Sequence, residues 1–214
     1  MTLHNTAFFP QALMPLYIFE PRYRQMLRDC LATNRLFAVA GLDVASSADA
    51  NVFEPPHRIA SVGIVRACQK NENGTSNLLL QGLCRVEIVK IVRDEPYRRI
   101  QIRALTSAAG ASADENEALR RELARLLSLK LKLASSDSKE MTSFLKTVDD
   151  PEAFVDIAAF SLCEDLPLKQ KLLETLDVHR RLKLFGARLR ADIESLKLRR
   201  TLQGSLPDDL IAGN

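Results

Sequence analysis

The chain has 214 residues, of which 46% are hydrophobic and 27% charged, and its formal net charge is +3. With only 8 glycines and 9 prolines, this composition is typical of a globular protein with an apolar core, and it excludes collagen-like, low-complexity and disordered chains. The net charge is too small to require a polyanionic partner, and no apolar run approaches the roughly 18 residues of a membrane-spanning helix. Residues 1–10 contain no Lys or Arg and lack the basic start of a signal peptide, so we expect a cytoplasmic protein.

An early helix is predicted just after Glu20. Pro21 suits the first helical position, because the N–H that proline lacks has no intrahelical partner there. An apolar stripe at helical spacing follows, formed by Tyr23, Met26, Leu27 and Cys30.

Short apolar runs rich in β-branched residues predict strands over most of residues 36–105. The runs are residues 36–42, 59–68, 77–83, 84–92 and 99–105. Asn73-Gly74 supplies the positive φ angles of a tight turn, so we expect the runs on either side to form an antiparallel hairpin. Within residues 84–92 the alternation slips by one residue at Val89, which indicates a β-bulge. Several short strands at close spacing favour a small barrel.

Helical periodicity replaces the strand pattern after residue 105. Small and polar residues at 106–113 (TSAAGASA) predict a linker. Helices are predicted over residues 114–133, 138–148, 151–162 and 167–176, and a long one after Asp177. The long helix carries an apolar stripe that includes Phe185 and Leu189, so we expect it to close a helical bundle. The predicted organisation is a β-rich part at 1–105, a linker at 106–113, a bundle at 114–203 and a tail at 204–214.

No familiar catalytic or metal-binding motif is present. The chain has no phosphate-binding loop, no Gly-x-Ser-x-Gly and no His-Glu-x-x-His, and its three histidines have no metal-ligand spacing. The acidic pairs ending in Asp150 and Asp165 directly precede helices that begin with proline, so capping explains them. We expect no cofactor and no metal; an enzyme acting through His57 or the acidic pairs is the minor alternative. The cysteines are interpreted as small buried apolar residues; they are Cys30, Cys68, Cys84 and Cys163.

Three pairs of segments carry a more specific signal. They are Phe9-Pro10 with residues 14–26 (MPLYIFEPRYRQM), residues 59–65 (IASVGIV) with 80–86 (LQGLCRV), and residues 166–174 (LPLKQKLLE) with 177–182 (DVHRRL). In this order they resemble the N-terminal substrate-recognition domain of Lon proteases, over residues 5–200. Tyr17 stands where that family usually has His, and the Gly that usually follows Phe-Pro is missing.

The resemblance implies an α+β fold: a small β-barrel of the pseudouridine-synthase-and-archaeosine-transglycosylase (PUA-like) type with one inserted helix, followed by a C-terminal helical bundle. Because the sequence contains neither the ATPase nor the Ser-Lys protease module of that family, we expect a stand-alone, non-enzymatic module that binds unfolded or extended polypeptides or a protein partner. A cleft between the two parts would suit an extended peptide. The candidate wall residues are Pro10, Met14, Tyr17, Phe19 and Tyr23. For Phe19 and Tyr23 the alternative is that they pack the early helix against the barrel.

RNA binding is the alternative function, because PUA-like barrels include RNA binders and the last helix is basic. Between Val178 and Arg200, eight Lys or Arg residues stand against two acidic ones, a local charge of +6. The candidate RNA contacts are Arg180, Arg188 and Arg199. A solvated helix face, or one that docks on an acidic partner, would explain the same charges.

Overall fold

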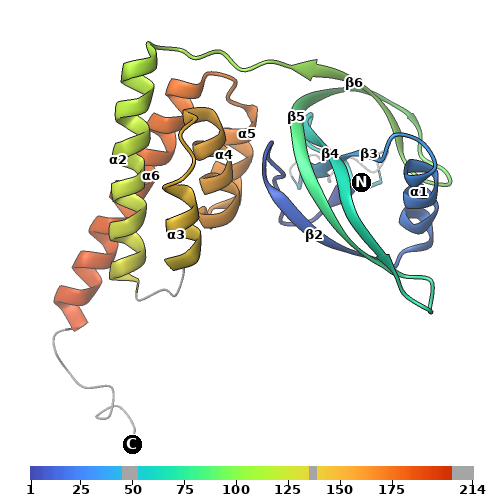
Figure 1. Cartoon of the computed structure of the whole chain (residues 1–214), viewed down its shortest axis with the longest axis horizontal. Helices are drawn as coiled ribbons and strands as arrows, with labels where there is room; N and C mark the ends of the chain where they lie inside the picture. The colour runs from blue at the N-terminus through green and yellow to red at the C-terminus, as the bar shows by residue number, and fades with distance from the viewer. Residues whose placement is uncertain (45–52, 135–138, 204–214) are drawn as a thin grey trace, which may run out of the picture.

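The structure, a computed structural model, describes residues 1–44, 53–134 and 139–203 and has the expected α+β fold (Figure 1). The strands are β1 (Thr2–Leu3), β2 (Leu13–Ile18), β3 (Leu36–Gly41), β4 (Ile59–Lys70), β5 (Ser76–Arg93) and β6 (Arg99–Leu105). The helices are α1 (Pro21–Leu31), α2 (Ala113–Leu133), α3 (Lys139–Leu145), α4 (Pro151–Leu162), α5 (Leu166–Glu174) and α6 (Val178–Gln203). The predicted tail at 204–214 lies outside the described residues.

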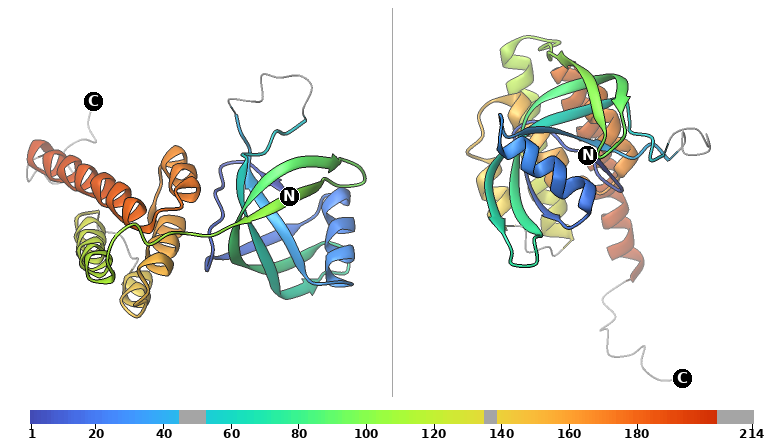
Figure 2. Two further views of the ribbon diagram at one scale, coloured as in Figure 1. Left: turned by 90° about the horizontal axis from the view of Figure 1, so that it is seen from above. Right: turned by 90° about the vertical axis from the view of Figure 1, so that its right-hand side faces the viewer.

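All six strands belong to one curled sheet. Its order is β1-β3-β4-β5-β2, and β6 also pairs with β5; only the β1–β3 pairing is parallel among the described strands. The first part of β5 pairs with β2 and its second part with β6, while β4 runs along the other edge of β5. Pairing among the described strands leaves the sheet open. Helix α1 lies on the side of the sheet away from α2–α6 (Figures 1 and 2).

The local predictions for the strands are confirmed, with one correction. β4 and β5 form an antiparallel hairpin whose turn holds Gly74 at φ 78°, and the register shifts between Ile88 and Lys90, where the bulge was predicted. The runs 77–83 and 84–92, however, form the single strand β5. The change of phase between them is a second register shift, opposite Val62 and Gly63, so the chain bends there without leaving the sheet.

The N-terminal strands β1 and β2 were not predicted. β2 is short, is apolar at every position and has Pro15 in its interior, a residue that cannot donate to a strand ladder. An edge strand tolerates such a proline, and β2 pairs with β5 along one edge only. The helix that follows begins at Pro21 as predicted and buries Tyr23, Met26 and Leu27.

The predicted helices are present, and the two aspartates that were expected to cap helices do so. The carboxylates of Asp150 and Asp165 accept hydrogen bonds from the backbone N–H of Ala153 (2.7 Å) and Leu168 (2.9 Å). Ser112 and Glu115 form a capping box that starts α2 at Ala113, one residue inside the predicted linker. α2 and α6 pack along each other, with α4 against both.

The segment between β6 and α2 is tied to the start of α6. The N–H of Ala108 donates to the carbonyl of Leu176 (3.0 Å), and the N–H of Val178 donates back to Ala108 (2.9 Å). The N-terminal segment also contacts the helices, because the ring of Phe8 meets that of Phe160 on α4 edge to face with centroids 6.3 Å apart. A single apolar cluster therefore contains residues from the sheet and from the helices.

The interpretation of the cysteines needs correction. Cys163 is buried, Cys30 and Cys84 are half-buried, and Cys68 is exposed. Cys68 lies in the last part of β4, where five consecutive residues are exposed because the β4–β5 hairpin extends beyond the core. None of the described helices is long and apolar enough to cross a membrane.

Candidate functional site

The edge strand β2 presents an uncovered apolar face. Along β2 the side chains alternate: Met14 and Ile18 are buried, while Leu13, Pro15 and Tyr17 are exposed. Leu13 is 51% and Tyr17 53% exposed, and Phe19, just after the strand, is 59% exposed. Single apolar residues are common on protein surfaces, but a contiguous row of them is typical of an interaction site.

The exposed residues form one continuous surface. The rings of Tyr17 and Phe19 are stacked, with centroids 5.9 Å apart and an interplanar angle of 25°. Pro15 lies opposite the half-buried Leu79 on β5, so the apolar surface continues onto the neighbouring strand. We refer to Leu13, Pro15, Tyr17, Phe19 and Leu79 as the β2 surface.

The structure divides the predicted wall residues into two groups. Tyr17 and Phe19 are exposed, whereas Pro10 is buried and Met14 and Tyr23 belong to the core. The hydroxyl of Tyr23 donates to the carbonyl of Thr2 (3.2 Å), and burial raises its pKa. The packing alternative is therefore correct for Tyr23 and wrong for Phe19, since Phe19 lies outside the core.

Sequence analysis missed Leu13 and Pro15. The signal that could have identified them is the register of β2, in which every second residue from Leu13 faces outwards. That signal was hidden because every residue of β2 except Tyr17 is aliphatic, so no polar residue marks the outer face.

A glycine sets the position of β2. Gly82 on β5 exchanges backbone hydrogen bonds of 2.9 Å with Gln11 and Ala12, just before β2 begins. A Cβ atom at Gly82 would lie 2.0 Å from the carbonyl oxygen of Phe9, far inside van der Waals contact. The close approach of the two backbones therefore requires glycine, and it places the start of β2 against β5.

Several basic residues of α6 form ion pairs. Arg180, Arg188 and Arg199 are exposed, as RNA binding would require. Arg188, however, donates to Asp192 (2.7 Å) and also pairs with Asp165; these carboxylates raise its pKa. Along the same helix, Arg190 pairs with Glu122 at 2.6 Å and Lys197 with Glu194 at 2.8 Å. The surface of α6 is thus less positive than its sequence.

A buried ion cluster joins the sheet to the helices. Arg85 on β5 makes two hydrogen bonds of 2.7 Å to Asp156 on α4, and Arg181 on α6 makes a third to the same carboxylate. All three side chains are at most 2% exposed. Burial disfavours the charged form of the nearby Glu152, yet hydrogen bonds from Ser107 and Arg181 hold its pKa below the usual value.

The groups of this ion cluster pair with one another and hold the sheet against the helices. Two arginines face Asp156 and Glu152, so the charges balance, and Arg85 also donates to the carbonyl of Leu173 (3.0 Å). Sequence analysis quoted Arg85 and Arg181 only as parts of the segments that resemble Lon domains. In the described parts of the chain, no group of three or more His, Cys, Asp or Glu residues could hold a metal ion.

Comparisons with known proteins agree on one family. The family profile described as "ATP-dependent protease La (LON) substrate-binding domain" matches residues 1–189. The chain is 27% identical to the Lon protease of Syntrophus aciditrophicus over 212 residues, which is 98% of this chain and 27% of that protein. It is 26% identical to the Lon protease of Koribacter versatilis over 97% of this chain and 25% of that protein. The chain thus spans about a quarter of these relatives.

Solved structures show the same fold. The "N terminal domain of Mycobacterium avium complex Lon protease" superposes with a TM-score of 0.69 at 17% identity, over 89% of this chain and 96% of that one. A "Lon N-terminal domain protein from Xanthomonas campestris" has a TM-score of 0.63 at 20% identity, over 87% of this chain and 95% of that one. Because the profile covers most of the sequence, the chain belongs to the family of Lon substrate-binding domains.

Proposed function

We propose that this chain is a polypeptide-recognition module that binds extended apolar segments of proteins on the β2 surface. The observation that carries the proposal is the stacked pair Tyr17 and Phe19, which is more than half exposed beside a strand edge that no other described strand pairs with. Aromatic side chains gain much from burial in an interface, and they lose little conformational entropy on binding. Membership of a substrate-binding family supports the same role.

The proposed mode of binding is strand addition. The edge of β2 that faces away from β5 has no strand partner among the described residues, so it can offer main-chain groups to an extended segment. Pro15 removes one donor from this strand, which limits uncontrolled pairing with other strands. Alternate side chains of the bound segment would then contact Leu13, Tyr17 and Phe19.

The proposal includes a domain organisation and a mode of action. The curled sheet with α1 would be the PUA-like barrel over residues 1–105, and the helices the bundle over residues 114–203. The pairing of β5 with three strands and the packing of α2 against α6 support this division. The module would act by binding alone, without a cofactor.

The test is binding of a permanently unfolded protein, such as reduced and carboxymethylated α-lactalbumin with a fluorescent label. Replacing Tyr17 and Phe19 together by serine should weaken binding about tenfold or more, since each ring loses its apolar burial. Leu198→Ser, at a position 59% exposed on α6, is the matched control and should bind as the wild type does. Equal affinity of the Tyr17/Phe19 variant and the wild type, with both folded, would overturn the proposal.

RNA binding remains the competing function, and the ion pairs of Arg188 argue against it. A single-stranded RNA oligonucleotide provides the test. Affinity that falls steeply with added salt, and that drops when Arg180, Arg188 and Arg199 are changed to alanine, would favour RNA over polypeptide.

A further inference from the structure

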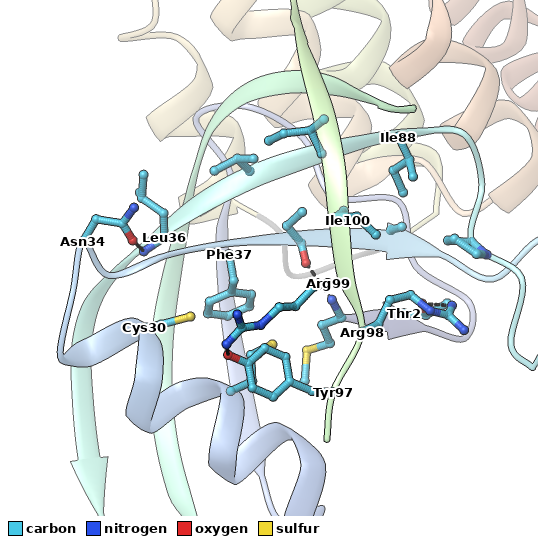
Figure 3. A pocket seen from close by; sticks show the side chains of 17 residues that line it. Thr2, Cys30, Asn34, Leu36, Phe37, Ile88, Tyr97, Arg98, Arg99 and Ile100 are labelled. Atoms are coloured by element: carbon cyan, nitrogen blue, oxygen red, sulfur yellow. Dashed lines mark hydrogen bonds between the residues drawn. The ribbon is translucent and has the colours of Figure 1, made fainter. Parts of the chain in front are cut away.

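A cavity lies between β3 and β6 (Figure 3), and no residue of the β2 surface lines it. Its volume is about 420 Å³, which is in the range of pockets that hold small ligands. The walls come from the N-terminal residues with β3, from β6, and from the adjacent parts of β4 and β5, and α1 adds further side chains. The cavity therefore lies where β6 faces β1 and β3, which do not pair with it among the described strands.

The lining of this cavity is mainly apolar. Figure 3 shows the apolar side chains of Leu36 and Phe37 from β3, Ile88 from β5 and Ile100 from β6 around the cavity. Ile102, which also lines the cavity, is 42% exposed. Phe37 is buried, but Leu36, Ile88, Ile100 and Ile102 are only partly covered by the protein, so an apolar ligand would remove their surface from water.

Two arginines stand at the cavity, and they differ in their partners. Arg98 donates to the side chain of Asp94 (2.6 Å) and to the carbonyl of Glu54 (2.7 Å), and it also contacts Phe53 and Thr2. Each of the three nitrogens of its guanidinium therefore already donates a hydrogen bond.

Arg99 keeps donors available. Its Nη2 donates to the hydroxyl of Tyr97 (3.1 Å) and forms a long ion pair of 3.9 Å with the carboxylate of Asp29, while no hydrogen bond from its Nε or Nη1 to a described residue is seen. Asp29 is itself occupied, because it accepts from Tyr97 (2.7 Å) and from Gln25 (2.9 Å). The side chain of Arg99 is 54% exposed at the cavity. A charged donor with free N–H groups beside an apolar cavity suits a carboxylate.

We propose that this cavity binds an apolar group that ends in a carboxylate, with the apolar part between β3 and β6 and the carboxylate on Arg99. Two sources share this chemistry: a medium-chain fatty acid, and the apolar C-terminal residue of a polypeptide. The site is separate from the β2 surface and does not depend on the function proposed for it.

The experiment titrates the full chain by calorimetry with four probes. Decanoate and decanol differ only in the charged end group. A short acetylated peptide that ends in Phe with a free carboxylate, and the same peptide as its amide, differ in the same way. We expect at least one of the acids to bind, and its neutral counterpart to bind about tenfold more weakly or worse, since a charge-assisted hydrogen bond is lost. Which acid binds more tightly identifies the source.

Three variants locate the site. Arg99→Gln should weaken the acid about tenfold and leave decanol unchanged. Arg103→Gln removes the same charge from β6 at a residue that pairs with Glu87 and does not line the cavity, so it should leave the acid unchanged. Ile102→Asp places a like charge in the lining and should abolish binding of the acid. Tyr17→Ser, on the β2 surface, should change nothing here.

Three results would overturn the proposal: neither acid binds, each acid binds no better than its neutral counterpart, or Arg99→Gln and Arg103→Gln weaken the acid equally. Thermal unfolding of each variant establishes that it is folded, and Arg99, Ile102 and Arg103 are all exposed enough to be substituted.

Discussion

Replacing Asp156 with alanine should remove much of the stability of this protein. The Asp156 carboxylate is 1% exposed and accepts two hydrogen bonds from Arg85 and one from Arg181. Without it, two guanidinium groups that are at most 2% exposed lose their main counter-charge in an interior that cannot hydrate them. Breaking a buried ion pair in this way costs about 3–5 kcal/mol.

Neighbouring groups decide where in that range the loss falls. Glu152 already lies 3.0 Å from Arg181 and 3.5 Å from Arg85, so it can compensate part of the charge. Arg85 also keeps its hydrogen bond to the carbonyl of Leu173. We therefore expect about 3–4 kcal/mol, a large fraction of the 5–15 kcal/mol that is typical of a whole domain.

Urea unfolding at neutral pH, followed by circular dichroism, measures the effect as a lower midpoint at an unchanged slope. Glu122→Ala breaks the exposed pair with Arg190 and should cost less than about 0.5 kcal/mol. Adding Arg181→Met to Asp156→Ala should recover part of the loss, because one unpaired buried charge is removed. A loss below about 1 kcal/mol in Asp156→Ala would refute the reasoning, since it would mean that water reaches the cluster.

Three further predictions concern packing, backbone geometry and pH. Phe185→Ala should lower the unfolding free energy by about 2–5 kcal/mol because Phe185 is 1% exposed. Lys183→Ala, at an exposed position of the same helix, should lower it by less than about 0.5 kcal/mol. Equal urea midpoints of the two variants would contradict the packing of α6. Gly82→Ala should lower the melting temperature because its Cβ would lie 2.0 Å from a carbonyl oxygen, while Gly186→Ala, with its nearest atom at 3.6 Å inside α6, should raise it. Partial burial of Asp192 raises the pKa of its carboxyl, but hydrogen bonds from Lys130 and Arg188 outweigh this effect and hold the pKa below its usual value of 3.8. The carboxylate therefore stabilises the fold fully above that pH, and this stabilisation is lost as the pH falls further. The difference in unfolding free energy between wild type and Asp192→Asn should shrink over the same range, and a constant difference would contradict this account.

Local chemistry was readable from the sequence. Asp150 and Asp165 cap helices because each side chain reaches a backbone N–H three residues further on, an interaction that needs no distant partner. Gly74 forms its turn because it adopts a positive φ, and the slip in alternation at Val89 matches a register shift in the structure. The family was also determined by the sequence, because its motifs are spread over most of the chain.

The exposure of the β2 surface depended on tertiary structure. Tyr17, Phe19 and Tyr23 stand within seven residues and are all aromatic, but Tyr23 is 6% exposed and the other two more than 50%. The difference arises because the chain changes from strand to helix at Glu20 and Pro21, which turns Tyr23 towards the core. No local pattern marks that outcome, because every residue of β2 except Tyr17 is aliphatic.

The ion cluster was decided by tertiary structure alone. Arg85 and Asp156 are 71 residues apart, and Asp156 and Arg181 are 25 apart, so no spacing rule connects them. In the sequence, Arg181 counts towards the basic charge of the last helix; in the fold it is fully buried and neutralised by Asp156. Short-range hydrogen bonding is determined by the order of residues, whereas burial and charge pairing follow from which elements pack together, and that depends on the whole chain.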